Sequence, residues 1–131
     1  MAAAKSPRRK RQQPEVQARD GRLNRVEISG RLRERKALRY TPAGVPVSEG
    51  VLEHASQQEE AGAMRQVTCE MTVVALGESA RWLQAAPLGG VFRLTGFLAA
   101  KNRHGKTPVL HVTTIEFLEG KENGTILQEE G

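Results

Sequence analysis

Two clusters of cationic side chains are the residues of this 131-residue sequence best suited to chemistry with a ligand. The first cluster consists of Arg31, Arg33, Arg35, Lys36 and Arg39, followed directly by Tyr40. The second cluster consists of Lys101, Arg103 and Lys106. Cations can neutralise phosphates and an aromatic ring can stack on a base, so both clusters are compatible with a nucleic-acid ligand. From the residues alone, a solvated strand end explains the first cluster equally well.

Catalytic and metal-binding patterns are weak by comparison. The three histidines have no metal-ligand spacing relative to Cys69, the single cysteine. Residues 77–81 lack the second glycine of a nucleophile elbow, and the chain contains no Walker-type phosphate loop. Cys69 lies on the apolar side of an alternating run, which predicts an inert thiol in the core. The sequence therefore predicts a binding protein and not an enzyme, with no metal and no cofactor.

Alternating side chains predict the strands that must position these clusters. In residues 66–73, apolar and polar side chains alternate with the period of a half-buried strand. Similar patterns predict strands over 25–35, 47–54, 91–98 and 109–118, and a short helix over 78–84. Gly30, inside the first strand, predicts a bend or bulge. Trp82 on the helix is expected to close the core rather than to stack on a base.

The segment between the second and third strands is expected to be a long polar connection. Residues 54–65 are rich in Gln, Glu, Ala and Gly, and Met64 is their one larger apolar side chain. A connection of this length and polarity is expected not to form a tight turn but to protrude as a mobile arm. The resulting long hairpin would offer a surface on which an extended ligand could lie.

The formal net charge of +5 is concentrated at one end of the chain. Residues 1–22 contain seven Lys or Arg and two Asp or Glu, whereas residues 23–131 contain thirteen of each. We therefore expect a disordered basic tail (1–22), a folded domain (23–119) and a frayed C-terminal tail (120–131). The basic tail is either an arm that holds nucleic acid or a solvated segment without a role. A mis-called start, with the natural chain beginning at Leu23, is a further hypothesis.

The same composition bears on where the protein works. No run of about 18 apolar residues is present, so no membrane span is expected. The basic start does not lead into an apolar stretch, so no signal peptide is expected. A single cysteine cannot form an internal disulfide and is typical of a reducing compartment, which predicts a cytoplasmic protein.

The order of these elements predicts an all-β fold, a five-stranded Greek-key barrel of the OB type. A long hairpin joins strands two and three, and the short helix lies between strands three and four. The two cationic clusters fall after strand one and between strands four and five, in the loops that border the ligand face of this fold. The strand over 91–98 is apolar on both sides, which predicts that one side meets the core and the other a partner subunit.

Several stretches between residues 23 and 119 resemble the bacterial primosomal replication protein N (PriB) family. The matching stretches are 24–30, 42–46, 51–54, 58–62, 65–66, 96–98 and 109–111. The most specific match is Val-Leu-Glu-His at 51–54 followed by Gln-Glu-Glu-Ala-Gly at 58–62. The resemblance implies a homodimer, cytoplasmic and associated with the nucleoid, that binds single-stranded DNA without sequence preference. It also implies that the protein bridges this DNA to a restart helicase and other primosome proteins.

The resemblance also implies which residues contact DNA. The cations that match the family's contacts are Arg39, Arg65, Lys101, Arg103 and Lys106, and the neighbouring Arg33, Arg35, Lys36 and Tyr40 complete the candidate set. Ala63 and Thr68 stand where better-known members carry aromatic residues, which predicts weaker and more salt-sensitive binding. Two alternatives are a general single-stranded DNA-binding protein and a protein-docking OB module whose DNA contact is incidental.

Overall fold

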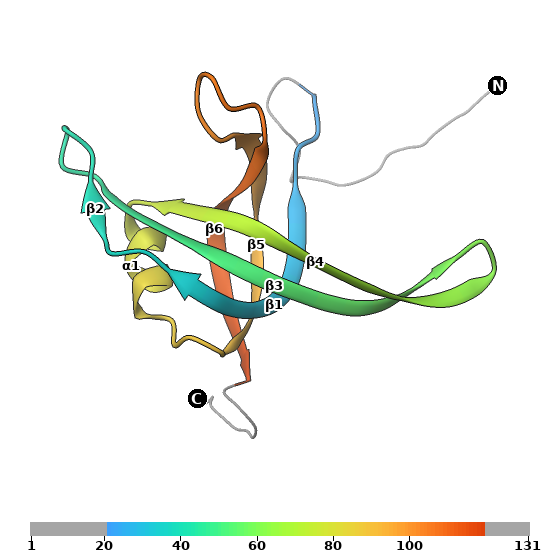
Figure 1. Cartoon of the computed structure of the whole chain (residues 1–131). Coiled ribbons are helices and arrows are strands. Elements are labelled where there is room, and N and C mark those ends of the chain that lie inside the picture. Colours follow the sequence, from blue (N-terminus) through green and yellow to red (C-terminus); the bar gives the residue numbers. More distant parts are fainter. Residues whose placement is uncertain (1–20, 120–131) are drawn as a thin grey trace.

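The computed structural model describes residues 21–119, and the predictions for the two tails lie largely outside this range. Its elements are β1 (Val26–Arg35), β2 (Arg39–Tyr40), β3 (Pro46–Glu60), β4 (Ala63–Leu76), α1 (Glu78–Ala85), β5 (Val91–Ala100) and β6 (Pro108–Glu119). The strands form one sheet in the order β1-β5-β6-β4-β3-β2, which pairing of β1 with β3 closes into a barrel (Figure 1). The predicted all-β barrel with one short helix is confirmed, and the two-residue β2 is added to its five strands.

The barrel closes because the first part of β1 pairs with one strand and its last part pairs with another. Residues 26–31 pair with β5, whereas residues 31–35 pair with β3, with a register shift between Leu32 and Glu34. At Gly30 the neighbouring strand approaches so closely that a Cβ atom would lie 2.4 Å from the carbonyl oxygen of Glu53. The irregularity predicted at Gly30 lies two residues farther on, between Leu32 and Glu34, whereas pairing with β5 is continuous through Gly30.

The core fills the barrel with aliphatic side chains from every long strand. Its most buried large members are Leu32, Leu52, Leu83, Leu94, Leu110 and Val73. From α1, Leu83 and Ala80 pack into this core, whereas Trp82 keeps 46% of its surface exposed. The prediction that Trp82 closes the core is therefore wrong, because the helix turns the adjacent Leu83 inward instead.

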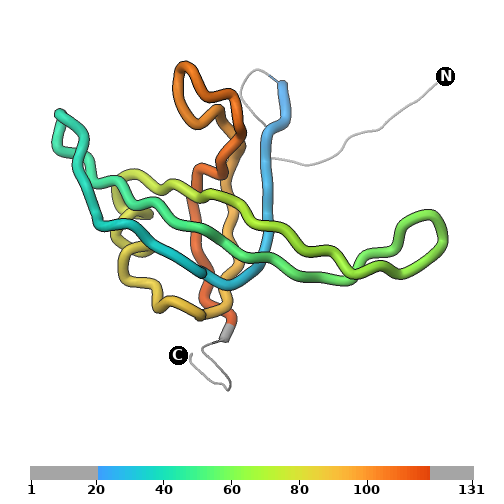
Figure 2. Tube along the Cα trace, in the orientation of Figure 1, coloured from blue at the N-terminus to red at the C-terminus, as the bar shows by residue number. Residues whose placement is uncertain are grey.

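β3 and β4 continue as a paired hairpin far beyond the barrel. Their register is unbroken from Val47 opposite Leu76 to Glu60 opposite Ala63. A two-residue turn, Ala61–Gly62, joins them with φ values of 55° and 82°, as in the turns that match the twist of a hairpin. The segment protrudes as expected, but the expectation that no tight turn joins the strands is wrong, because the paired backbones satisfy their own hydrogen bonds although both faces are solvated. Figures 1 and 2 show this hairpin projecting sideways from the barrel.

The outer part of this hairpin, Glu53–Glu70, is called the arm below. None of its residues is buried. Cys69, which lies opposite His54 in the arm, is exposed, so the prediction of a core thiol is wrong. The alternation that includes Cys69 reaches the core from Met71 onward, since Met71 packs against the core and Val73 and Ala75 are buried in it.

Candidate nucleic-acid interface

Two loops rise at the same end of the barrel, the end opposite to that where β6 finishes (Figures 1 and 2). One loop follows β2 and leads into β3 through a turn in which the backbone N–H of Thr41 donates to the carbonyl of Val45 at 2.9 Å. The other is the β5–β6 loop, residues 101–107. The β5–β6 loop contains the second cationic cluster, whereas of the first cluster only Arg39, followed by Tyr40, adjoins the loop after β2.

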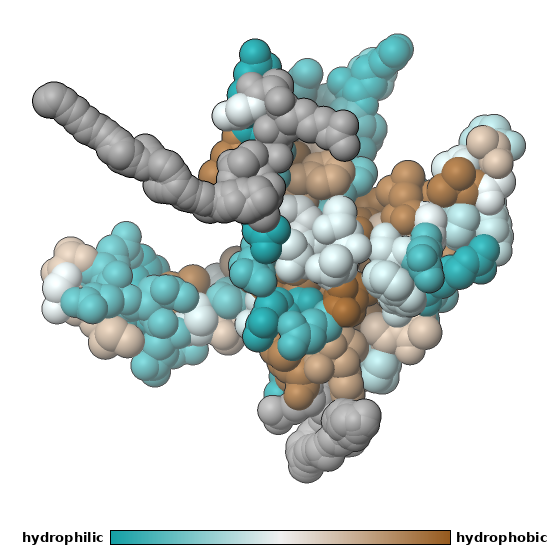
Figure 3. Space-filling model, turned by 180° about the vertical axis from the view of Figure 1, so that it is seen from behind, coloured by the Kyte–Doolittle hydropathy of each residue, from teal (hydrophilic) through white to brown (hydrophobic). Residues whose placement is uncertain are grey.

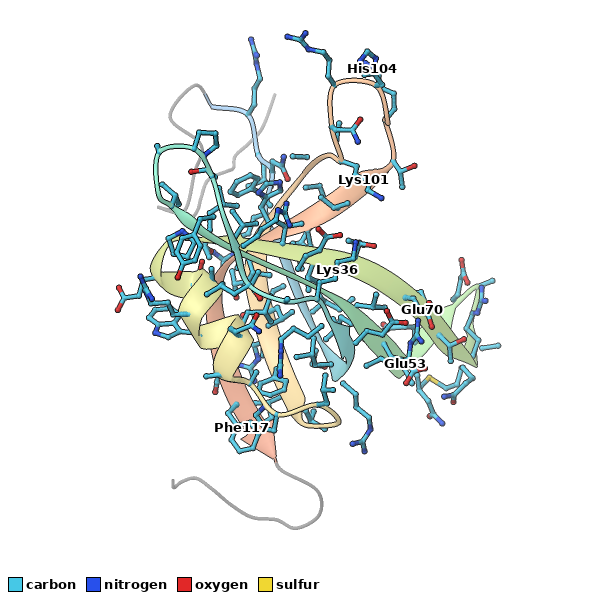
Figure 4. The ribbon with its side chains drawn as sticks, turned by 60° about the vertical axis from the view of Figure 1, so that its left-hand side comes forward. Lys36, Glu53, Glu70, Lys101, His104 and Phe117 are labelled. Carbon is cyan, nitrogen blue, oxygen red and sulfur yellow. The ribbon has the colours of Figure 1, made fainter. Side chains whose placement is uncertain are left out.

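The β5–β6 loop presents its cations without neutralising partners. Lys101, Arg103 and Lys106 are exposed, and no carboxylate of the described residues lies within ion-pair distance of them. The side-chain oxygen of Asn102 accepts hydrogen bonds from the backbone N–H groups of His104 and Gly105, which fixes the tip of the loop. Figure 4 shows Lys101 at the base of this loop and His104 at its tip.

The cations after β1 are arranged differently, because they share a carboxylate. The ammonium of Lys36 lies 3.3 Å from Glu49, and the guanidinium of Arg39 lies 3.5 Å from the same side chain. Glu49 is on β3, and its side chain is only 14% exposed. A phosphate that binds here must compete with Glu49 for both cations.

Arg33 and Arg35 are also engaged within the protein. Arg33 lies 3.0 Å from Glu34 and 3.0 Å from Glu70, which ties the end of β1 to β4. The guanidinium of Arg35 donates to the carbonyl of Ala86, just after α1, in a partly buried contact. In these positions both side chains hold elements of the barrel together.

Tyr40 is the aromatic side chain beside the first cluster. It is 57% exposed on β2, next to Arg39, where its ring is open to a base. Ala63 and Thr68 lie on the exposed arm, which carries no aromatic ring other than the imidazole of His54. The arm therefore presents no Phe, Tyr or Trp ring, whereas the Tyr40 ring stands next to Arg39 and the His104 imidazole lies among the cations of the β5–β6 loop.

Arg65 lies apart from the two loops, near the tip of the arm. Its guanidinium is 2.7 Å from Glu60 across the hairpin. The structure therefore brings Lys101, Arg103 and Lys106 together, places Lys36, Arg39 and Tyr40 on a second segment, and leaves Arg65 on a third. In Figure 4, Lys36 lies lower on the barrel than Lys101.

Sequence reasoning missed the carboxylates that hold these cations. Glu49, Glu60 and Glu70 become partners of Lys and Arg only through cross-strand register, which no local pattern displays. Only the pair of Arg33 with the adjacent Glu34 has a signal in the sequence, as neighbouring opposite charges.

Two further findings concern other kinds of site. In residues 21–119, no three His, Cys, Asp or Glu side chains are grouped so that they could hold a metal ion. The one helix of this range is too short to cross a membrane.

Comparison with known proteins places these features in a family. Residues 24–114 match the family described as another single-strand binding protein family. The replication restart protein PriB of Nitrosomonas europaea is 40% identical over 89 residues, which are 68% of this chain and 82% of that protein. PriB of Bordetella pertussis is 38% identical over 98 residues, which are 75% of this chain and 92% of that protein.

Solved structures of PriB and of single-stranded DNA binding proteins are also similar to this chain. PriB from Ralstonia solanacearum has a TM-score of 0.67 and 35% identity, covering 73% of this chain and 98% of its own. The wild-type single-stranded DNA binding protein from Thermus aquaticus has a TM-score of 0.61 and 28% identity, covering 76% of this chain and 52% of its own. The chain therefore belongs to the PriB family of replication restart proteins, which shares its OB-fold barrel with single-stranded DNA binding proteins.

Proposed function

We propose that this protein binds single-stranded DNA in replication restart and acts as an accessory protein of the primosome. The observation that carries the proposal is the β5–β6 loop, whose Lys101, Arg103 and Lys106 are exposed and have no carboxylate partner among the described residues. Unpaired cations on a loop beside an OB-fold barrel are suited to a flexible polyanion. The names of the PriB relatives support the setting in replication restart.

The contacts are unequal in strength. Phosphates bind first to the β5–β6 loop, because its cations need not leave another partner. Lys36 and Arg39 bind phosphate only when their ion pairs with Glu49 break. The cost of breaking those ion pairs offsets part of the binding free energy that the new phosphate contacts provide. Tyr40 stacks on one base, an interaction of roughly 1–3 kcal/mol. Binding is therefore mainly electrostatic and strongly weakened by salt.

The test neutralises the β5–β6 loop in the full chain. The triple variant Lys101→Gln, Arg103→Gln, Lys106→Gln should lose most of its affinity for a fluorescent oligo-dT in anisotropy titrations. The fall of log K with log salt should become less steep, by about 0.7 for each phosphate that the variant no longer neutralises. The matched control removes three arginines elsewhere on the surface, Arg25, Arg81 and Arg93, also by Gln. If the loop variant binds as tightly as this control, the loop is not where DNA binds.

Partner proteins form the second part of the proposal. We infer that the protein links DNA to a restart helicase and other primosome proteins, on the strength of the family relationship. Pull-down of the helicase together with DNA titration separates this role from its two rivals. DNA binding without helicase contact favours a general single-stranded DNA-binding protein, and the reverse favours a protein-docking module.

A homodimer is the third part of the proposal. On β5, Phe92 and Leu94 are buried in the core, whereas Phe97 on the opposite side is 40% exposed. The Phe97 ring stacks on that of His111 with centroids 5.2 Å apart and planes 10° apart. These rings line a groove of about 450 Å³, together with Leu76 and Trp82. A second copy of this chain would cover this apolar surface.

A further inference from the structure

The basic tail, residues 1–22, is a feature of the sequence for which the proposed function does not account. It contains seven Lys or Arg and two Asp or Glu, whereas residues 23–131 contain thirteen of each. Five of its cations lie within residues 5–11, Lys-Ser-Pro-Arg-Arg-Lys-Arg, a stretch without a carboxylate. The tail therefore carries the whole charge excess of the chain, and what it can contact depends on where the chain enters the barrel.

Asn24 fixes the point at which the chain enters the barrel. Its side-chain amide donates to the carbonyl of Leu98 at 2.9 Å, and its side-chain oxygen accepts from the backbone N–H of Leu98 at 3.0 Å. Pairing of β1 with β5 begins two residues later, at Val26 opposite Gly96. The two hydrogen bonds of Asn24 therefore extend the contact between β1 and β5 toward the end of β5.

This attachment places the start of the described chain beside the β5–β6 loop. Because β1 and β5 are antiparallel, the chain before Asn24 leads toward the loop that follows β5, and Lys101 comes only three residues after Leu98. Figures 1 and 2 show the chain from residue 21 rising next to this loop at the same end of the barrel. Figure 3, seen from behind, shows hydrophilic side chains projecting at that end. The basic tail therefore joins the barrel next to the loop whose cations have no carboxylate partner among the described residues.

Covalent geometry keeps the cations of the tail within reach of a ligand bound at this loop. Arg11 is ten residues from Gly21, and a fully extended chain of that length spans at most about 36 Å. The tail and the loop carry charge of the same sign, so they repel each other. A polyanion attracts both of them, and single-stranded DNA that is longer than the contacts of the loop can occupy both at once.

We propose that the basic tail is a second phosphate-binding segment, which extends the DNA site outward from the β5–β6 loop. A strand held by Lys101, Arg103 and Lys106 continues past the loop to the tail, where the five cations of residues 5–11 neutralise further phosphates. Because the two segments belong to one chain, a strand bound at the loop meets the tail at a high effective concentration. This inference rests on the proposed DNA binding and adds to it a segment outside the barrel.

The test removes charge from the tail in the full chain and varies the length of the DNA in anisotropy titrations. Two oligo-dT lengths, about 8 and about 35 nucleotides, lie within and well beyond the roughly 4–16 nucleotides that an OB fold covers. The double variant Arg8→Gln, Arg9→Gln should bind the long oligonucleotide several-fold more weakly than the unaltered chain. The fall of log K with log salt should become less steep by about 1.4 for two phosphates that are no longer neutralised. Affinity for the short oligonucleotide should change little, because the barrel and its loops already hold most of its phosphates.

The matched control is Arg81→Gln, Arg93→Gln, which removes the same charge from exposed positions on α1 and β5. It should weaken the binding of both oligonucleotides slightly and by the same factor. A tail variant that behaves like this control would show a general charge effect and overturn the inference. Unchanged binding of the tail variant, or an equal loss of affinity for both lengths, would overturn it as well.

The triple loop variant Lys101→Gln, Arg103→Gln, Lys106→Gln distinguishes a failure of this inference from a failure of the proposed function. If the loop variant loses affinity and the tail variant does not, DNA binds at the loop and the tail takes no part. If the loop variant binds both oligonucleotides as the unaltered chain does, the loop is not the DNA site and the proposed function fails, together with the extension from the loop.

Discussion

Lys36 and Arg39 share one carboxylate, whereas the three cations of the β5–β6 loop have none among the described residues. Residues of the same charge can therefore differ in what they contribute to binding. Glu49 is the residue that controls this difference, because it lies close to both cations from a mostly shielded position on β3. The carboxylate of Glu49 is therefore close enough to the surface to pair with both cations, although little of its side chain is accessible to solvent.

The variant Glu49→Gln should bind single-stranded DNA more tightly than the unaltered protein. The amide keeps the size of the side chain but no longer attracts Lys36 and Arg39, which become available to phosphates. Neutralising two further phosphates would steepen the fall of log K with log salt by up to about 1.4. Anisotropy titrations over a series of salt concentrations measure both quantities.

The control for this variant is Glu78→Gln, at the first position of α1, where the carboxylate is exposed. It removes the same charge without releasing a cation. If both variants bind DNA with the same affinity and the same salt dependence, Glu49 does not restrain the two cations.

At the scale of elements, the barrel depends on how closely β5 and β6 approach each other. The pairing shifts register between Thr95 and Gly96, and Gly96 then lies against the backbone of β6. A Cβ atom at Gly96 would lie 1.8 Å from the carbonyl oxygen of His111. Since this neighbour is backbone, it cannot move aside as a flexible side chain would.

Gly96→Ala should therefore lower the free energy of unfolding by about 1–3 kcal/mol or more, as overpacking typically does. Urea unfolding followed by circular dichroism measures the change. Gly105→Ala is the control, because its Cβ would meet only the side chain of Asn102, at 3.3 Å, in an exposed loop. If Gly96→Ala is as stable as Gly105→Ala, the close approach of the two strands is not a constraint.

At the scale of the whole molecule, surfaces of different character face different directions. The cationic β5–β6 loop stands at one end of the barrel, and the arm projects to the side (Figure 1). The exposed ring of Phe97 lies on the outer side of β5, away from the core. This separation means that the proposed DNA surface and the proposed dimer surface do not overlap on the chain.

Phe97→Asp should weaken the proposed dimer, because a carboxylate on this surface loses its hydration when a second copy covers it. Sedimentation at micromolar concentration should then give a mass near the 14.4 kDa of a single chain. Leu88→Asp is the control, since this side chain is 56% exposed in the loop before β5. A dimer that persists in Phe97→Asp would place the interface between copies elsewhere.

The sequence by itself determined the barrel, because alternation of apolar and polar side chains, clearest in residues 25–35 and 66–73, is a local property of a strand with one buried face. It also placed the cations of the β5–β6 loop correctly, since the Lys-Asn-Arg-His-Gly-Lys segment forms a loop with its charges exposed. The matches at 51–54 and 58–62 indicated the family to which the chain belongs.

Only the tertiary structure decided the pairing of the arm, the position of Cys69 and the ion-pair partners of Lys36 and Arg39. Residues 54–65 of the arm gave no periodic signal, because both faces of the hairpin are solvated there, and only the register from Val47 to Glu60 shows that the arm is paired throughout. Cys69 lies outside the core although its neighbours alternate, because the barrel begins only farther along β4. The partner of Lys36 and Arg39, Glu49, could not be inferred from the sequence either. An ion pair between distant segments depends on which strands lie next to each other, and that is a property of the whole fold.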